Sequence, residues 1–125
     1  MYKQKRIITI QDISCLGRCS ITVALPVLSC AGVETTILPT AMLSTHTGGF
    51  TGFTCKDLES EIMPIVNHWM SLDDVHFDGI YTGYLASGEQ IKLVMKVFEM
   101  VKEKNNLYVM VDPAMADNGK MYPAF

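Results

Sequence analysis

Residues 6–11 read Arg-Ile-Ile-Thr-Ile-Gln, a run of β-branched residues that has the length of one strand and ends at polar Asp12. A second run of the same character spans Val33 to Leu38. Two further strands are expected at Phe77–Tyr81 and Leu107–Val111. The last of these runs is continuously apolar, so we expect it to be buried on both faces, as strands of parallel sheets are.

Helical patterns separate these strands. Gly32 is the expected C-terminal cap of a first helix, and the spacing of Thr54 and Asp57 resembles a capping box that would start a second helix. The same spacing at Ser87 and Gln90 predicts the start of a third helix. The residues expected on the buried faces are Ile21, Leu25 and Leu28, then Leu58, Ile62, Ile65, Val66 and Trp69, and finally Ile91, Val94, Met95, Phe98 and Val101.

The resulting order is β-α-β-α-β-α-β, with connections long enough for crossover helices. This order predicts an α/β protein in which a mainly parallel sheet lies between helices, in a doubly wound, three-layer α-β-α arrangement. No internal repeat or linker is visible, so residues 1–125 are interpreted as one unit. The segment Thr40–Thr54 has neither strand nor helix periodicity and is expected to be a functional or mobile loop.

The composition argues against several classes of partner. Ten Lys and Arg residues against 13 Asp and Glu give a formal net charge of −3 without any basic run. Neither nucleic acid nor an anionic membrane surface is therefore an expected partner. The apolar stretches fall far short of the roughly 20 residues that span a bilayer, and no signal-peptide pattern is visible. We expect a cytoplasmic protein with its four cysteines reduced.

Small and polar residues follow all four predicted strands. In doubly wound sheets, ligands bind in the crevice beyond the carboxyl ends of the strands, so these residues are the first candidates for a site. They should converge on one edge of the sheet. They are Asp12 and Ser14, then Thr40 and the run Ser44-Thr45-His46-Thr47-Gly48-Gly49, then Thr82-Gly83-Tyr84, and finally Asp112 and Asp117.

Each candidate also has a purely structural explanation. Asp12 could cap a helix or a turn, and Thr47 could lie in a flexible loop beside its glycines. Tyr84 could serve packing, although an aromatic ring at a strand end also suits stacking on a planar ligand. Asp112 could form a turn before its proline, or could hold Mg²⁺ through water together with Asp117. The three histidines receive no catalytic assignment.

Five motifs occur in order along the chain. They are Ile10-Gln11-Asp12; Gly17-Arg18-Cys19-Ser20 through Leu25-Pro26; Leu38-Pro39-Thr40 through Ser44-Thr45-His46-Thr47-Gly48-Gly49; Thr82-Gly83-Tyr84-Leu85; and Val111-Asp112-Pro113 through Asp117-Asn118-Gly119. Together they resemble the vitamin B6 kinases, which are the pyridoxal, pyridoxine and pyridoxamine kinases of the ribokinase-like superfamily. The resemblance covers nearly the whole chain. It implies a ribokinase-like fold and Mg²⁺-assisted transfer of phosphate from ATP to the 5′-hydroxymethyl group of a B6 vitamer, in pyridoxal 5′-phosphate salvage.

The resemblance also implies roles for individual residues. Asp12, Thr47 and Tyr84 match positions that line the substrate pocket of the family. Asp112 and Asp117 match aspartates that face the nucleotide phosphates and the Mg²⁺ region. Asp12 stands where B6 kinases commonly have serine and where sugar and nucleoside kinases of the superfamily have aspartate, so the hydrogen bonds to the vitamin are expected to differ.

Other parts of the family pattern do not occur in this sequence. It has no Gly-Thr-Gly-Asp-like run and no Walker-type phosphate loop, and the catalytic aspartate is expected beyond Phe125. In the loop from Asp112 to Asp117, which the resemblance places near the nucleotide phosphates, Ala114 and Ala116 replace the Val and Gly that are familiar in the family. The resemblance therefore implies the N-terminal half of a homodimeric kinase, inactive by itself. A hydroxymethylpyrimidine or other small-molecule kinase, and a non-catalytic binding or oligomerisation fragment, stay open as alternatives.

Overall fold

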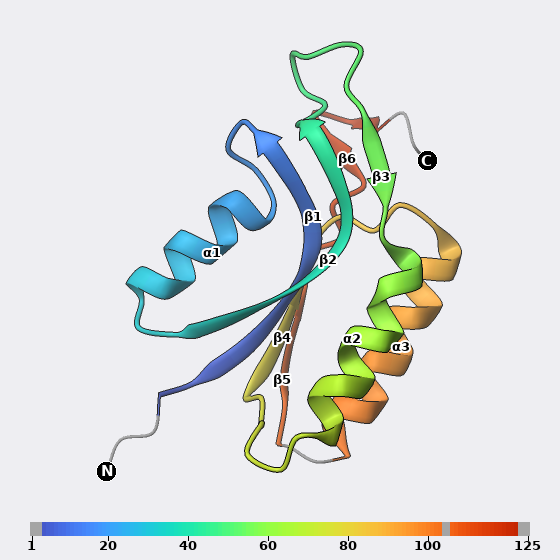
Figure 1. Ribbon diagram of the computed structural model, residues 1–125. Coiled ribbons are helices and arrows are strands. Elements are labelled where there is room, and N and C mark those ends of the chain that lie inside the picture. Colours follow the sequence, from blue (N-terminus) through green and yellow to red (C-terminus); the bar gives the residue numbers. More distant parts are fainter. Residues whose placement is uncertain (1–3, 104–105, 123–125) are drawn as a thin grey trace.

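The computed structural model describes residues 4–103 and 106–122, and its centre is a five-stranded sheet of order β3-β2-β1-β4-β5 (Figure 1). The strands are β1 (Arg6–Leu16), β2 (Glu34–Thr45), β3 (Cys55–Asp57), β4 (Gly79–Thr82) and β5 (Tyr108–Val111). The neighbouring pairs β2-β1, β1-β4 and β4-β5 are parallel, and only β3 runs antiparallel to its neighbour. The predicted mainly parallel α/β sheet is therefore confirmed.

Helices cover both faces of the sheet. One face carries α1 (Ile21–Cys30), and the other carries α2 (Glu59–Ser71) and α3 (Gly88–Lys102), as Figure 1 shows. This is the three-layer arrangement that the element order predicted. A small hairpin of β6 (Ala116–Asp117) and β7 (Lys120–Met121) follows β5. No described helix has the length and apolar content needed to cross a membrane.

The main core lies between the sheet and the α2–α3 layer. Trp69 packs at its margin with its ring 5.8 Å from that of Phe77. Ile91 and Met95 were expected in the core, but they are exposed, and α3 instead buries Val97 and the polar Gln90. The core residues are Ile8, Ile10, Leu38, Ile62, Val66, Phe77, Ile80, Val94, Val97 and Val101.

The helix caps agree with two of the three predictions. After α1, Gly32 has a φ of +82°, and the Gly32 and Val33 N–H groups return to the carbonyls of Ser29 and Leu28. At α3, Ser87 Oγ accepts a 3.0 Å hydrogen bond from the Gln90 N–H.

The predicted capping box at the start of α2 is wrong. Residues 55–57 pair with β2 as strand β3, and Thr54 donates its N–H to Ser44 Oγ. The helix starts later, at Glu59, whose N–H donates to Asp57 Oδ1 over 2.6 Å. Pairing with a distant strand thus overrides a local spacing of residues.

β1 and β2 both extend well past their predicted ends. Their polar continuations are buried inside the sheet, with Asp12, Ser14 and Thr40 at most 6% exposed. The first part of the expected loop Thr40–Thr54 is therefore the end of β2. The β1–β2 register shifts between Gln11 and Ile13, so Asp12 lies at an irregularity of the ladder.

The expectation that the last strand is buried on both faces is wrong. Tyr108 is 80% exposed and Met110 is 60% exposed. β5 is the last strand of the described sheet and pairs only with β4, while α1 contacts β1 and β2. An apolar sequence cannot reveal how many neighbours a strand has.

Candidate functional site

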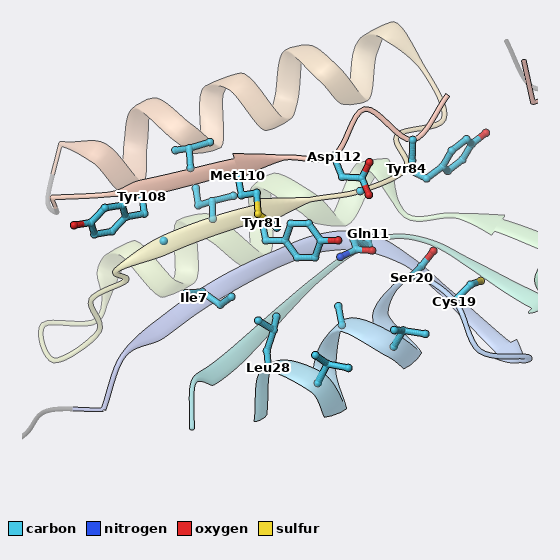
Figure 2. Close-up of a pocket in the computed structure, with 18 residues that line it drawn as sticks. Ile7, Gln11, Cys19, Ser20, Leu28, Tyr81, Tyr84, Tyr108, Met110 and Asp112 are labelled. Atoms are coloured by element: carbon cyan, nitrogen blue, oxygen red, sulfur yellow. The ribbon is translucent and has the colours of Figure 1, made fainter. Parts of the chain in front are cut away.

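A groove of about 910 Å³ lies between α1 and the β1, β4 and β5 side of the sheet (Figure 2). Its polar end is formed by Gln11 from the middle of β1, by residues that follow β4 and β5, and by the start of α1. Most of the remaining lining is apolar and comes from α1, β4 and β5. The residues at the polar end are Gln11, Cys19, Ser20, Tyr84 and Asp112, and two further tyrosines, Tyr81 and Tyr108, line the rest of the groove.

Asp12 is not itself a lining residue of the groove but lies beside its polar end, where hydroxyl groups hold the carboxylate. Ser20 Oγ donates to Asp12 Oδ1 over 2.6 Å, and Ser14 Oγ donates to Asp12 Oδ2 over 3.2 Å. Cys19 Sγ in turn donates to Ser14 Oγ over 3.3 Å. Asp12 is only 6% exposed. Its carboxylate bonds to the Ser20 side chain rather than to backbone N–H groups of α1, so these contacts are not those of a helix cap.

The turn between β1 and α1 has an unusual backbone. Ser20, the N-cap of α1, has φ 51° and ψ −128°, a region that non-glycine residues rarely occupy. Gly17 has a φ of +104°, and a Cβ at this position would overlap the imidazole of His46. The His46 N–H donates to the Leu16 carbonyl over 3.1 Å. The turn is therefore fixed from both sides, by Asp12 and by His46.

Tyr84 follows β4 and is partly buried at the polar end of the groove. Burial raises the pKa of its phenol above the ordinary value, and the negative charge of Asp12 raises this pKa further. The phenol thus stays protonated and keeps its O–H at neutral pH. Thr47, by contrast, is exposed in the segment after β2 and does not line this groove.

The two aspartates proposed for Mg²⁺ lie at and beyond the end of β5. Asp112 lines the groove, and its N–H donates to the Thr82 carbonyl over 3.0 Å. Asp117 lies in β6, and both residues are exposed. Exposed carboxylates suit Mg²⁺, which keeps several of its waters and binds through one or two such groups. The described residues contain no cluster of three or more His, Cys, Asp or Glu side chains placed for a metal ion.

Gln11 and Ser20 also line the groove, although neither was predicted from the sequence as a site residue. Gln11 Nε2 donates to Thr9 Oγ1 over 2.9 Å, and the Gln11 side chain lies so close to Gly83 that a Cβ there would overlap it. Both residues belong to motifs that carried the family resemblance. Eight positions separate Ser20 from Asp12, however, and no local pattern predicts a contact across a strand-to-helix turn.

Known proteins of similar sequence and structure point to one group of enzymes. A Bacteroides thetaiotaomicron protein assigned as a phosphomethylpyrimidine kinase and crystallised with pyridoxal is 41% identical, with a TM-score of 0.90 over 98% of this chain and 42% of its own. Pyridoxal kinase from Lactobacillus plantarum is 30% identical, with a TM-score of 0.85 over 98% of this chain and 43% of its own. A pyridoxal kinase of Histophilus somni is 30% identical over 93 residues, which are 71% of this chain and 32% of the relative. No family model matches the chain.

These findings place the chain in the ribokinase-like class of kinases, with the fold that the motifs implied. Within that class its relatives are pyridoxal kinases and phosphomethylpyrimidine kinases, so the resemblance to the B6 kinases is confirmed. The chain spans 32% to 43% of the length of the three relatives described above.

Proposed function

We propose that this chain forms the substrate-binding part of a kinase that phosphorylates the 5′-hydroxymethyl group of pyridoxal, pyridoxine or pyridoxamine. The observation that carries the proposal is the polar end of the groove, near the carboxyl ends of β4 and β5, which brings Ser20, Tyr84 and Asp112 together beside Asp12. Its position matches the crevice in which doubly wound sheets bind ligands. The names of the relatives supply the substrate class.

The residues have complementary roles in this proposal. Asp12 accepts hydrogen bonds from the vitamer, while Tyr84 offers an aromatic face for its flat ring. Thr47, which the family resemblance also assigns to the substrate, lies outside the groove and has no role in this proposal. Asp112 and Asp117 hold Mg²⁺ through water at the phosphate side of the groove. When bound, Mg²⁺ neutralises charge on the phosphates of ATP, the phosphoryl donor.

The complete reaction needs groups that this chain does not supply. Phosphoryl transfer requires a nucleotide site and a group that accepts the proton of the substrate hydroxyl. The three relatives are more than twice as long as the chain. We propose that the catalytic base and most nucleotide contacts belong to the part of such proteins that this chain does not match. The 125-residue chain would then bind substrate without turnover. A homodimer in the cytoplasm completes the proposal.

A related substrate is the second candidate. The relative assigned as a phosphomethylpyrimidine kinase is more identical to this chain than the two pyridoxal kinases described above. Asp12 also departs from the serine expected in B6 kinases. A hydroxymethylpyrimidine carries an amino group on its ring. This amino group can donate a hydrogen bond to a carboxylate.

A phosphorylation assay on the complete gene product separates the two candidates. The panel comprises pyridoxal, pyridoxine, pyridoxamine and hydroxymethylpyrimidine, each with ATP and Mg²⁺. Turnover of a B6 vitamer is the expected result. Turnover of hydroxymethylpyrimidine alone would transfer the assignment to the second candidate. If the complete protein turns over none of the four but the chain binds pyridoxal, a non-catalytic binding role is favoured instead.

A further inference from the structure

Asp12 carries a nearly buried carboxylate without a cationic partner in the part of the chain that the structure describes. The ion pairs there are Lys5–Asp78, Arg6–Glu34, His76–Asp78 and Lys92–Glu89, and none of them includes Asp12. The hydrogen bonds recorded for the Asp12 side chain come from the hydroxyls of Ser14 and Ser20. These hydroxyls are neutral and leave the negative charge uncompensated.

A purely structural role for Asp12 would leave its buried charge without a positively charged partner. Charges buried in proteins are usually paired, because removing them from water is costly. A carboxylate has about four acceptor positions, and the two serine hydroxyls fill two of them. The remaining positions can take only donors, and a donor that is also positively charged gains most.

The surroundings of Asp12 indicate where such a donor would sit. Ser20, which holds Asp12 Oδ1 at 2.6 Å, also lines the groove, and so does Tyr84. The charge of Asp12 raises the pKa of the Tyr84 phenol, so the two side chains share one electrostatic environment. In Figure 2, Ser20, Tyr84 and Asp112 lie toward the same end of the groove, and the Tyr84 ring points away from the other two side chains.

We propose that Asp12 makes this site selective for a ligand that brings an ammonium group to the end of the groove between Ser20 and Tyr84. The proposal rests on the proposed function and refines its substrate class. Among the B6 vitamers, it favours pyridoxamine, which carries an ammonium group where pyridoxine carries a hydroxyl of similar size. A serine at this position would not distinguish the two by charge.

The test compares amine and alcohol ligands of matched shape. Affinities of the complete protein are measured by titration calorimetry for pyridoxamine and pyridoxine, and for 3-(aminomethyl)pyridine and 3-pyridinemethanol. The wild type should bind the amine of each pair more tightly. Asp12→Asn should reduce this preference about tenfold, which is the order expected when a hydrogen bond loses its charge. Equal preferences in wild type and Asp12→Asn would overturn the proposal.

Additional variants distinguish the loss of the Asp12 charge from a general loss of structure. Ser20→Ala removes a hydroxyl donor but retains the Asp12 charge, so the preference for amines should persist. Asp12→Ser also removes the charge, with a smaller side chain. This variant should lose the preference for amines, as Asp12→Asn does. Asp74→Asn is the control, because Asp74 is an exposed aspartate that belongs to none of the four ion pairs above. Circular dichroism of each variant verifies that the fold is retained.

The simple pyridine pair separates this proposal from the proposed function. If no B6 vitamer binds or is phosphorylated, but 3-(aminomethyl)pyridine is preferred in an Asp12-dependent manner, the charge selectivity stands and the B6 assignment fails. If the vitamers are phosphorylated without any preference for the amine, the B6 assignment stands and the charge selectivity fails.

Discussion

Ser20 Oγ donates a 2.6 Å hydrogen bond to Asp12 Oδ1 and so ties the first turn of α1 to the middle of β1. Ser20 makes this contact from a backbone conformation with φ 51°, which costs a non-glycine residue of order 1–3 kcal/mol. The bond also satisfies one oxygen of a nearly buried carboxylate. Strain in the turn is therefore tolerated where it orders a side chain at the candidate site.

Two substitutions of Ser20 separate the contribution of its hydrogen bond to stability from the cost of its strained backbone. Ser20→Ala should lower the free energy of unfolding by about 1–3 kcal/mol, because Asp12 loses a donor while the strained backbone remains. Ser20→Gly loses the same donor but accepts a positive φ readily, so it should be about 1 kcal/mol more stable than Ser20→Ala. Urea denaturation measures both. An alanine variant as stable as the glycine variant would show that the turn stores no strain.

Gly17 offers a second test of this turn. Gly17→Ala must adopt a φ of +104° and also overlap the His46 ring, so we expect a loss of about 2–4 kcal/mol. Gly32→Ala is the matched control, because Gly32 also has a positive φ but nothing lies within 4 Å of a Cβ there. It should lose only about 1–2 kcal/mol. Equal losses, measured by urea denaturation, would mean that the His46 ring moves aside freely.

The raised pKa of Tyr84 has a consequence at alkaline pH. Burial is the larger cause and the Asp12 charge the next. The folded protein keeps the phenolic proton at pH values where the unfolded chain loses it. Stability should therefore be unaffected well below pH 10.0, the ordinary pKa, and should fall as pH rises from there to the raised pKa of the folded state.

Tyr84→Phe should remove this part of the alkaline dependence, and Asp12→Asn should reduce it. Urea denaturation at a series of alkaline pH values measures the slope, and the ultraviolet absorbance of tyrosinate reports the titration itself. Parallel pH dependences for wild type and Tyr84→Phe would count against a perturbed Tyr84.

Asp117 tests the proposed metal region. Asp117→Asn in the complete protein should raise the Mg²⁺ concentration required for half-maximal activity by several-fold, since one carboxylate no longer orients the hydrated ion. Asp73→Asn serves as a control because Asp73 is exposed in the segment between α2 and β4. Identical metal titrations for wild type and Asp117→Asn would remove Asp117 from the site.

The sequence predicted the layers of the fold better than the extent of its strands. Runs such as residues 6–11 are rich in β-branched residues, so strand character is visible locally. The ends of β1 and β2 were missed because Asp12, Ser14 and Thr40 are polar but buried. A period-based pattern assigns polar residues to loops, whereas here these three are buried within β1 and β2.

The candidate site shows the same division. Tyr84 and Asp112 follow from the rule that ligands bind beyond the ends of parallel strands, whereas Asp12, predicted by the same rule, lies in the middle of β1. The role of Ser20 could not be predicted, because it depends on a turn whose geometry is fixed by Asp12 on one side and by His46 beyond Gly17 on the other. Contacts of this kind are set by tertiary structure rather than by spacing.

The bare outer side of β5 has a practical consequence for work with this chain. Its four residues, Tyr-Val-Met-Val, contain no charge and no proline, the features that discourage edge strands from recruiting further strands. Concentrated samples are consequently at risk of intermolecular β-pairing and gradual precipitation. A gatekeeper lysine, introduced as Val111→Lys, should slow that process in a light-scattering assay on the 125-residue chain, because Val111 is exposed on β5 and does not line the groove.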